Sequence, residues 1–371
     1  MNVPLLDLVA QYQSIKDEVL PAMQAVIESQ QFIMGPAVGK LETALAALSH
    51  ARHGIACASG TDALLLPLKA LQLAPGDEVV TTPFTFFATA GAIHNAGGTP
   101  VFVDIEPDTF NIDPAAVEAA LTARTRAIVP VHLYGQMAAM ERLVRVAARR
   151  AIPIVEDACQ AIGARRSIDG EWRMAGELGW ATAYSFFPSK NLGAWGDAGM
   201  IVTSDDAAAE RLRRLRTHGG AKQYHHEEVG TNSRLDTLQA AILLAKLAHL
   251  ASWSARRREH AAYYSAALGG VAAVRTPVVA PGNEHIFHQY TLRVERRDAL
   301  QAHLKEKGIG SAVYYPIPLH LQQCFAHLGY RAGRFPHTEQ ATREVISLPV
   351  YPELRRDQLD YVIDAIRAFY R

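Results

Sequence analysis

The sequence predicts an α/β protein with a parallel-rich sheet covered by helices, followed by a smaller C-terminal α+β domain. Short apolar runs typical of buried parallel strands recur at residues 79–81, 101–103, 127–131 and 154–155. Helical patterns, such as the one over residues 138–150, separate these runs, and strands that alternate with helices form parallel sheets. A chain of 371 residues is also long for one compact unit, which favours two domains.

The remaining elements follow in order along the chain. Asp113 and Pro114 are typical of a helix entry, as the cap and the first-turn residue. A long helical pattern links the two domains, which we place at residues 1–248 and 249–371. Other expected elements are strands at 55–57, 180–184 and 290–294, and helices at 115–121, 235–268 and 297–307.

Composition excludes several classes of function. The chain has 37 basic and 37 acidic residues, so no net positive field favours nucleic acid. The N-terminus lacks the regions of a signal peptide, and no apolar run approaches the length of a membrane span. Three cysteines without metal spacing suit a reducing cytoplasm, and the adjacent His225 and His226 lack the spacing of metal ligands. We therefore expect a cytoplasmic protein without a metal ion.

The most informative segment runs from Ser185 to Gly199 and contains one lysine, Lys190, among aromatic and turn-forming residues. A lysine beside Phe186 and Phe187 is partly desolvated, which lowers the pKa of its amine and makes the neutral nucleophile available. Schiff-base chemistry requires such an amine. The alternative is an ordinary lysine on a surface loop.

An acidic pair, Glu156 and Asp157, follows the short apolar strand at 154–155. Ligands of open α/β sheets bind at the carboxyl ends of the strands. Pyridoxal phosphate requires a carboxylate at its pyridinium nitrogen, and Asp157 fits that role, with Gln160 one helical turn further on and able to face the ring. The alternative is that the two acids cap the N-terminus of a helix.

A small-residue turn, Ser59-Gly60-Thr61, follows the apolar residues 55–57 and begins a helical pattern. Backbone amides at such a helix start suit a phosphate, although many helices begin with these residues for capping alone. Further along, an aromatic cluster, Phe84 to Phe87, follows the strand at 78–82. One of these rings can stack on a flat cofactor, and filling the core is the alternative role.

These motifs resemble the DegT/DnrJ/EryC1/StrS family of nucleotide-sugar aminotransferases, within the fold-type I pyridoxal-phosphate enzymes. The resemblance runs over nearly the whole chain, in family order. Its specific motifs are Ser-Gly-Thr-Asp-Ala-Leu (59–64), Thr-Pro-Phe-Thr-Phe (82–86), Glu-Asp-Ala (156–158), Ser-Phe-Phe-Pro-Ser-Lys (185–190) and Asn-Ser-Arg-Leu-Asp (232–236). The resemblance implies a large domain with a mostly parallel seven-stranded sheet and a smaller C-terminal domain.

The resemblance also implies the site residues and their roles. Lys190 would carry the cofactor and then move the proton, while Asp157 keeps the ring protonated. Phe86 would stack on the ring face, and Asn232 would reach the cofactor phosphate of the neighbouring subunit in a homodimer. The full expected set adds Ser59, Gly60, Thr61, Gln160 and Ser185 for the cofactor, and Tyr315, His320 and Gly35 for the substrate.

By family analogy, L-glutamate donates the amino group to a keto-hexose carried on dTDP or UDP, in a ping-pong scheme. Family members that act at C4 tend to carry Thr-Thr-Gly-Glu-Gly-Gly after the lysine, whereas residues 191–199 here resemble the C3 group. Ala198 departs from the usual glycine, and Trp195 is bulkier than the common tyrosine. The alternatives are a C4-specific enzyme, a sugar dehydratase with histidine in place of the lysine, and a regulatory homologue.

Overall fold

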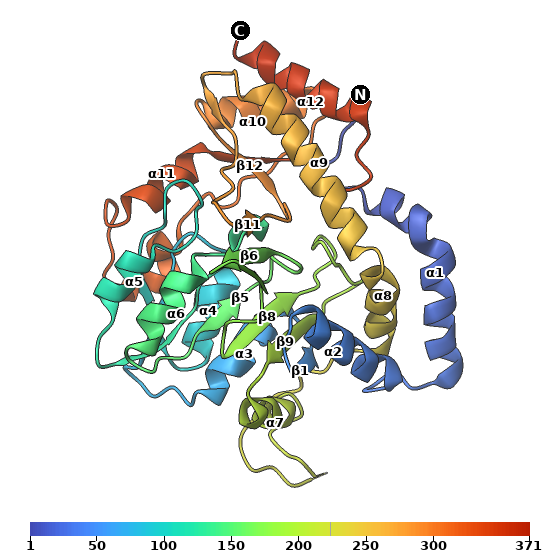
Figure 1. Ribbon diagram of the computed structural model, residues 1–371, viewed down its shortest axis with the longest axis vertical. Coiled ribbons are helices and arrows are strands. Elements are labelled where there is room, and N and C mark those ends of the chain that lie inside the picture. The colour runs from blue at the N-terminus through green and yellow to red at the C-terminus, as the bar shows by residue number, and fades with distance from the viewer. Residues whose placement is uncertain (223) are drawn as a thin grey trace.

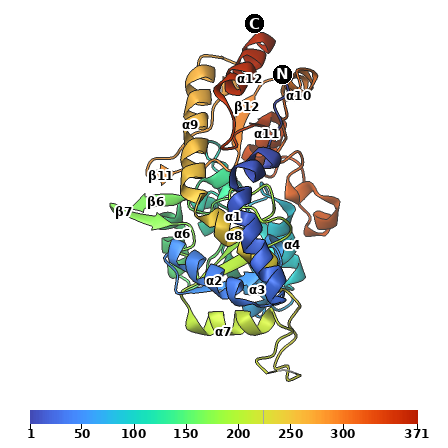
Figure 2. The ribbon, with the colours of Figure 1, turned by 90° about the vertical axis from the view of Figure 1, so that its right-hand side faces the viewer.

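The computed structural model describes residues 1–222 and 224–371 (Figure 1). A broad lower part is built around a central sheet, and a smaller part lies above it and contains both chain termini. The side view in Figure 2 shows the short strands β6 and β7 projecting from one side of the molecule.

The central sheet carries the candidate site. Its strands are β1 (His53–Cys57), β2 (Glu78–Thr81), β3 (Thr99–Phe102), β4 (Thr125–Ile128), β5 (Val155–Asp157), β8 (Ala181–Ser185) and β9 (Gly199–Thr203). They form the orders β1-β9-β8-β5 and β3-β2-β4, and the parallel bridges Ile128↔Ile154 and Val131↔Asp157 join the two groups into one sheet of seven strands. Only β9 runs antiparallel to its neighbours, so the predicted mostly parallel sheet is confirmed.

Helices cover both faces of this sheet. They are α2 (Pro36–Leu48), α3 (Gly60–Ala70), α4 (Phe87–Asn95), α5 (Pro114–Ala120), α6 (Met140–Ala148), α7 (Asp206–Leu215) and α8 (Thr237–Leu247). Side chains of α2, α5, α6 and α8 join one apolar core, and those of α3, α4 and α7 join another. Val80 of β2 belongs to the first core and Val79 to the second, because successive side chains of a strand point to opposite faces.

Local sequence signals explain where several helices begin. The Ser59 hydroxyl caps α3 by accepting a hydrogen bond from the Asp62 amide at 3.1 Å. The Asp113 carboxylate caps α5 by accepting from the Ala115 amide at 2.9 Å, and Pro114 occupies the first turn. Both predicted helix starts are confirmed.

The smaller part has its own sheet and core. Its strands β10 (Val274–Arg275), β12 (Tyr290–Val294) and β13 (Val345–Leu348) pack against α9 (Leu250–Leu268), α10 (Arg297–Glu306) and α12 (Arg356–Phe369). The other elements are α1 (Leu8–Ser29), α11 (Pro336–Glu344) and the sheet β11-β6-β7, with β6 (Arg165–Ile168), β7 (Glu171–Met174) and β11 (Asn283–Glu284). Short 3-10 helices span Leu133–Gly135, Leu319–Leu321 and Gln323–Leu328. Among the described residues, no helix is long and apolar enough to cross a bilayer.

The long helical pattern over 235–268 is two helices in the structure, α8 and α9, which are separated at Ala248 and His249. Leu243 of α8 packs in the core under the large sheet, whereas Tyr264 of α9 packs in the core of the smaller part. The chain has to change direction between two cores, which periodicity alone does not reveal. The domain boundary between 248 and 249 stays a prediction; Val3, near the N-terminus, pairs with Ile309 in the smaller part.

A fully buried hydrogen bond between a histidine and a carboxylate joins the strands around the candidate site. The His132 Nε2 lies 2.7 Å from the Glu156 carboxylate, and neither side chain is exposed to solvent. The Ala138 amide donates to His132 Nδ1, so Nε2 carries the proton that is donated to Glu156. Glu156 also accepts hydrogen bonds from the amides of Gly176, Leu178 and Gly179.

Replacing Glu156 with glutamine should destabilise the protein strongly, because the amide has one acceptor oxygen in place of two and leaves two of the four buried donors facing its NH2 group. We expect a loss of about 3 kcal/mol or more in the free energy of unfolding, measured by urea unfolding. The control is Glu118→Gln, which breaks an exposed ion pair with Arg149 and should cost less than about 1 kcal/mol. Similar losses in both variants would contradict the structural role of Glu156.

Candidate active site

The carboxyl edge of the central sheet brings the predicted site residues together. Asp157 ends β5, Ser185 ends β8, and Ser59 follows the parallel strand β1. Phe86 lies after β2 at the same edge, where it immediately precedes α4. Parallel strands end on one side of a sheet, so segments far apart in the sequence meet there.

The start of α3 forms an anion-binding cradle with the end of β8. The amides of Gly60 and Thr61 lie in the first turn of the helix, where backbone N–H groups have no intrahelical acceptor and the helix dipole favours negative charge. A Cβ atom on Gly60 would lie 2.5 Å from the Ser185 Cβ and 2.7 Å from its Oγ. Only a residue without a side chain therefore lets the helix approach the serine this closely.

Asp157 is a buried carboxylate with one hydrogen bond on each oxygen. Its Oδ2 accepts from the Thr89 hydroxyl at 2.8 Å, and its Oδ1 accepts from the Cys159 amide at 3.2 Å. No helix follows in residues 158–163, so the interpretation of Glu156 and Asp157 as a helix cap is wrong. Gln160 accordingly lies in a turn and not one helical turn along.

The predicted lysine lies on a turn between β8 and β9. Burial lowers the pKa of Lys190, while the nearby Cys159 and Asp157 act in the opposite direction. The direction agrees with the desolvation expected from the aromatic setting. An amine with a lowered pKa beside a buried carboxylate is suited to carbonyl chemistry and to proton transfer.

Side chains from distant elements anchor the residues that follow Lys190. The Asn191 amide group donates to the Ile286 carbonyl at 3.2 Å, and its oxygen accepts from His288 Nδ1 at 3.1 Å. The Lys246 ammonium on α8 donates to the Gly193 carbonyl, and burial lowers the pKa of this second lysine to about 8. The turn is therefore held by α8 on one side and by the segment of Ile286 and His288 on the other.

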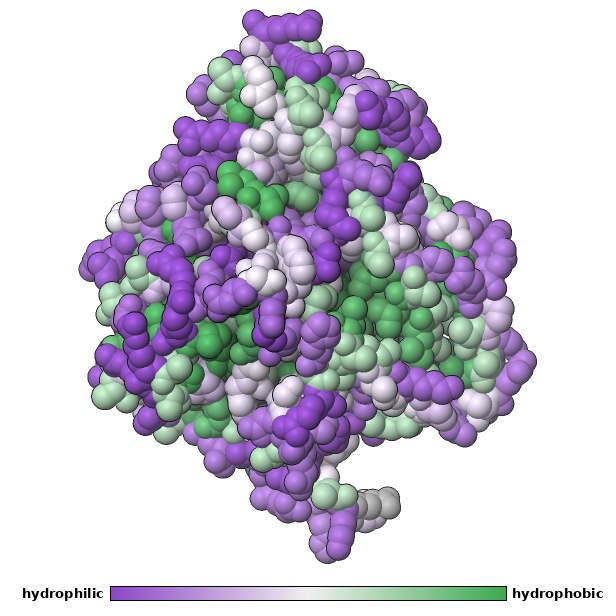
Figure 3. Space-filling view, viewed as in Figure 1, coloured by the Kyte–Doolittle hydropathy of each residue, from purple (hydrophilic) through white to green (hydrophobic). Residues whose placement is uncertain are grey.

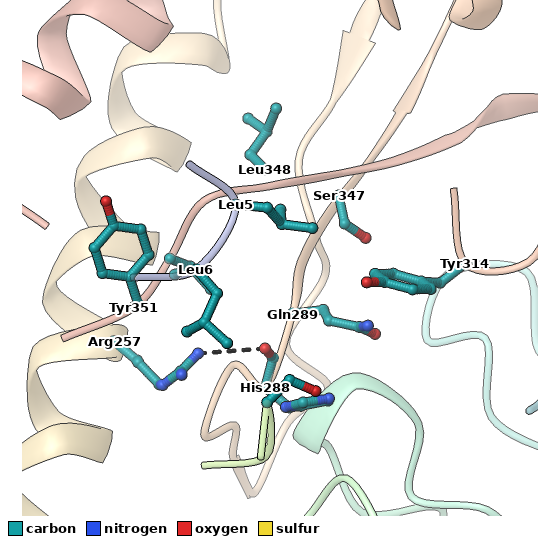
Figure 4. A pocket seen from close by; sticks show the side chains of 11 residues that line it. Leu5, Leu6, Arg257, His288, Gln289, Tyr314, Ser347, Leu348 and Tyr351 are labelled. Carbon is teal, nitrogen blue, oxygen red and sulfur yellow. Dashed lines mark hydrogen bonds between the residues drawn. The ribbon is translucent and has the colours of Figure 1, made fainter. Parts of the chain in front are cut away.

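A cavity of about 90 Å³ lies beside this turn, and Ser189 contributes to its wall (Figure 4). Arg257 of α9 reaches toward it and donates to the His288 carbonyl at 3.3 Å, which Figure 4 marks with a dashed line. Leu5 and Leu6 of the N-terminal segment also line this cavity (Figure 4). The N-terminal residues thus line a space next to the lysine turn, which sequence reasoning did not anticipate.

The aromatic cluster divides into one buried ring, Phe84, and two exposed rings, Phe86 and Phe87. Phe86 is 57% exposed and lies 6.3 Å from the ring of Tyr315, measured between centroids. Phe84 is fully buried, and Phe87 stacks on Phe325 at 5.7 Å. Phe87 is already stacked on Phe325, so Phe86 is the better placed of the two exposed rings to stack on a ligand.

The other predicted residues have different surroundings. Gln160 donates to the Tyr315 hydroxyl at 2.9 Å, so these two lie together beside Phe86. His320 is buried away from them, 3.1 Å from Glu339 and edge-on to Phe335. Gly35 is buried at the start of α2, and Asn232 is exposed on the surface. Their positions and that of His320 do not test the roles expected for them, and the three roles stay predictions.

Sequence reasoning missed Thr85 and Thr89, whose hydroxyls lead to Asp157. Thr85 precedes the N-cap of α4 and Thr89 lies in its first turn, and this spacing of four residues is a signal that could have been used. It also missed Asn191 and His288, for which the sequence offers no signal because they are 97 residues apart.

The site fits pyridoxal phosphate by the chemistry of its donors. The first-turn amides of α3, which have no intrahelical acceptor, and Gly60 suit the phosphate, Asp157 suits a protonated ring nitrogen, and Lys190 suits the aldehyde. Among residues 1–222 and 224–371, no three His, Cys, Asp or Glu side chains are grouped as ligands for a metal ion.

Comparisons with known proteins agree with this fit. The sequence profile of the DegT/DnrJ/EryC1/StrS aminotransferase family matches residues 13–367. A relative from Geobacillus stearothermophilus, named a pleiotropic regulatory protein, is 54% identical over 100% of this chain and 99% of its own length. The UDP-N-acetyl-3-dehydro-α-D-glucosamine 3-aminotransferase of Acidithiobacillus ferrooxidans is 44% identical over 98% of this chain and 97% of its own.

A solved structure agrees as well. The crystal structure of S. venezuelae DesV in complex with a ketimine intermediate superposes with a TM-score of 0.96 at 44% identity. The match covers 100% of this chain and 99% of that one.

Replacing Gly60 with alanine should weaken the binding of pyridoxal phosphate, because the new methyl group collides with Ser185. Overpacking of this kind corresponds to a roughly tenfold rise in the dissociation constant, measured by equilibrium dialysis of the apoprotein. Gly39→Ala in α2 is the matched control, since a Cβ atom there has open space within 4 Å. Unchanged cofactor affinity in the Gly60 variant would show that the cradle lies elsewhere.

Proposed function

The chain belongs to the DegT/DnrJ/EryC1/StrS aminotransferase family, and on that premise we propose that it moves an amino group from L-glutamate to C3 of a keto-hexose carried on dTDP or UDP. In general terms, the protein is a pyridoxal-phosphate-dependent aminotransferase of nucleotide sugars, an enzyme of amino-sugar biosynthesis. The observation that carries the proposal is Lys190, an amine with a lowered pKa at the sheet edge that also holds Asp157 and the α3 cradle.

Each residue of the site then has a defined task. Bound pyridoxal phosphate supplies an electron sink for the substrate carbon and a carrier for the amino group. Lys190 attaches the cofactor through its neutral amine and afterwards holds and moves a proton at Nζ. Asp157 stabilises a proton at the ring nitrogen, and Ser59, Gly60, Thr61 and Ser185 hold the phosphate. Phe86 covers one ring face, and Gln160 lies beside Tyr315.

Two observations support C3 as the position of transfer. Residues 191–199 resemble the segment of the C3 group. The relative from A. ferrooxidans is named a 3-aminotransferase, and other relatives are named for 3-amino sugars. Trp195 lies on this segment, 37% exposed, with its ring 5.6 Å from that of Tyr12. A residue of this size near the lysine turn can influence which sugar carbon faces the amine.

The rival functions are disfavoured by the same residues. A sugar dehydratase of this family has histidine in place of the lysine, whereas Lys190 is present here. The name of the G. stearothermophilus relative suggests regulation, yet this chain has both the lysine and the ring-nitrogen acid in one site. The cytoplasmic location expected from the cysteine content stays a prediction.

We also propose a homodimer in which Asn232 completes the phosphate site of the partner. Asn232 is exposed, and the neighbouring segment Phe32–Met34 is exposed and apolar, held to the chain by the bridge Ile33↔Asp236. Phe86 and Phe187 add further exposed rings, at 57% and 53% exposure. Obligate interfaces are large and apolar, so a second copy would cover such side chains.

The purified protein, supplied with pyridoxal phosphate and L-glutamate, should aminate a 3-keto-hexose on dTDP or UDP, with mass spectrometry of the nucleotide sugar as the measurement. Lys190→Ala should lose at least about a hundredfold in rate while its circular dichroism is unchanged. Lys190→Arg should be equally inactive, because a guanidinium does not deprotonate. Activity of either variant near that of the parent would overturn the assignment of Lys190, and amination of 4-keto sugars alone would replace C3 by C4.

Shared sites predict complementation between two inactive variants. Lys190→Ala and Asn232→Glu are mixed as subunits, so that one site of the heterodimer has both an intact lysine and an intact asparagine. We expect roughly a quarter of the parent activity per total site at statistical mixing, because one site in two is intact in half of the dimers. No recovery, although tagged heterodimers are isolated, or an active monomer by sedimentation would contradict the shared site.

A further inference from the structure

The start of α4 directs a chain of hydroxyl groups at the Asp157 carboxylate. The Thr89 hydroxyl lies 2.8 Å from Asp157 Oδ2, and the Thr85 hydroxyl lies 2.9 Å from that of Thr89. All three side chains are buried, with exposures of 2%, 1% and 5% for Thr85, Thr89 and Asp157. The two hydroxyls and the carboxylate therefore form a buried hydrogen-bonded row.

The direction of the hydrogen bonds follows from counting protons. A hydroxyl has one hydrogen, and an ionised carboxylate only accepts. Thr89 therefore donates to Asp157, which leaves Thr85 as the donor to Thr89. Both hydroxyl dipoles point toward the carboxylate, an arrangement that stabilises its ionised form and strengthens along the chain in a buried setting.

The Thr89 hydroxyl does not make the hydrogen bond that is common for a threonine in a helix. In helices this hydroxyl commonly bonds to a backbone carbonyl of the preceding turn. Here it bonds to a carboxylate on another element, 68 residues away in the sequence. Together with the Cys159 amide on Oδ1, it fixes both oxygens and hence the plane of the Asp157 carboxylate, with lone pairs left over on each.

We infer that Thr89, supported by Thr85, is a positioning residue that aims the Asp157 carboxylate at the cofactor's ring nitrogen and keeps it ionised. The inference rests on the proposed role of Asp157. It also explains why Phe86 is the N-cap residue of α4 and Thr89 lies in its first turn: the start of one helix presents a ring to the cofactor face and orients the acid for its nitrogen.

The test compares two cofactors on the full-length apoprotein. One is pyridoxal phosphate, and the other is its 1-deaza analogue, in which C–H replaces the ring nitrogen. Both have the same aldehyde and phosphate, so the ratio of their dissociation constants isolates the contact at the ring nitrogen. We expect Thr89→Val, which is close to isosteric, to lower the preference for pyridoxal phosphate roughly tenfold or more, since a hydrogen bond to a charged group is lost.

Matched variants separate positioning from packing. Thr89→Ser retains the hydroxyl and should recover the preference to within about threefold of the parent. Thr182→Val is the control in β8, because the buried Thr182 hydroxyl has no hydrogen-bond partner among the described residues, and it should leave the preference unchanged. If valine disturbs folding, Thr89→Ala supplies the same comparison.

A parent-like preference in the folded Thr89→Val or Thr89→Ala variant would overturn the inference, as would an equal loss of affinity for both cofactors. Asp157→Asn distinguishes this failure from failure of the proposed function. If the asparagine variant loses the preference and the Thr89 variants do not, only the role of Thr89 is wrong. If the asparagine variant also retains it, the assignment of Asp157 to the ring nitrogen is wrong.

Discussion

The parallel pairing of β5 with β8 is the constraint on which the candidate site depends. Asp157 is in register with Ala183, two residues before Ser185, so the ring-nitrogen acid and the serine of the anion cradle leave the sheet at the same edge. The lysine turn follows β8 directly, and its position relative to Asp157 is thereby set as well. A slip of one residue would send each of these side chains to the opposite face.

The two adjacent acids of β5 have different roles, one in stability and one in the candidate site. Successive side chains point to opposite faces, so Glu156 and Asp157 enter different surroundings. Glu156 meets His132 and three backbone amides, which consume its hydrogen-bonding capacity in holding the sheet together. Asp157 accepts from one hydroxyl and one backbone amide, so acceptor capacity remains for a ligand.

Apolar side chains are exposed where a second chain is proposed to bind. The apolar side chains of residues 32–34 are exposed, and this segment forms a backbone bridge with Asp236. A groove of about 480 Å³ between α1, α2 and α8 is lined mainly by small apolar residues, and Figure 3 shows hydrophobic side chains in the region of α2 and α8. Exposed apolar area of this kind is uncommon on isolated chains and typical of surfaces that another protein covers.

The sequence by itself determined six of the seven strands of the central sheet, all but β9, because apolar periodicity is a local property. It also determined the helix starts at Ser59 and Asp113 and pointed to Lys190 and Asp157, because capping and motif order are local as well. Only the tertiary structure decided the break between α8 and α9, the burial of His320 against Glu339, and the separate surroundings of Phe84, Phe86 and Phe87. It also decided that Thr89 contacts Asp157. These features arise from contacts between residues far apart in the chain, and a side chain's partner across such a distance leaves no periodic trace in the sequence.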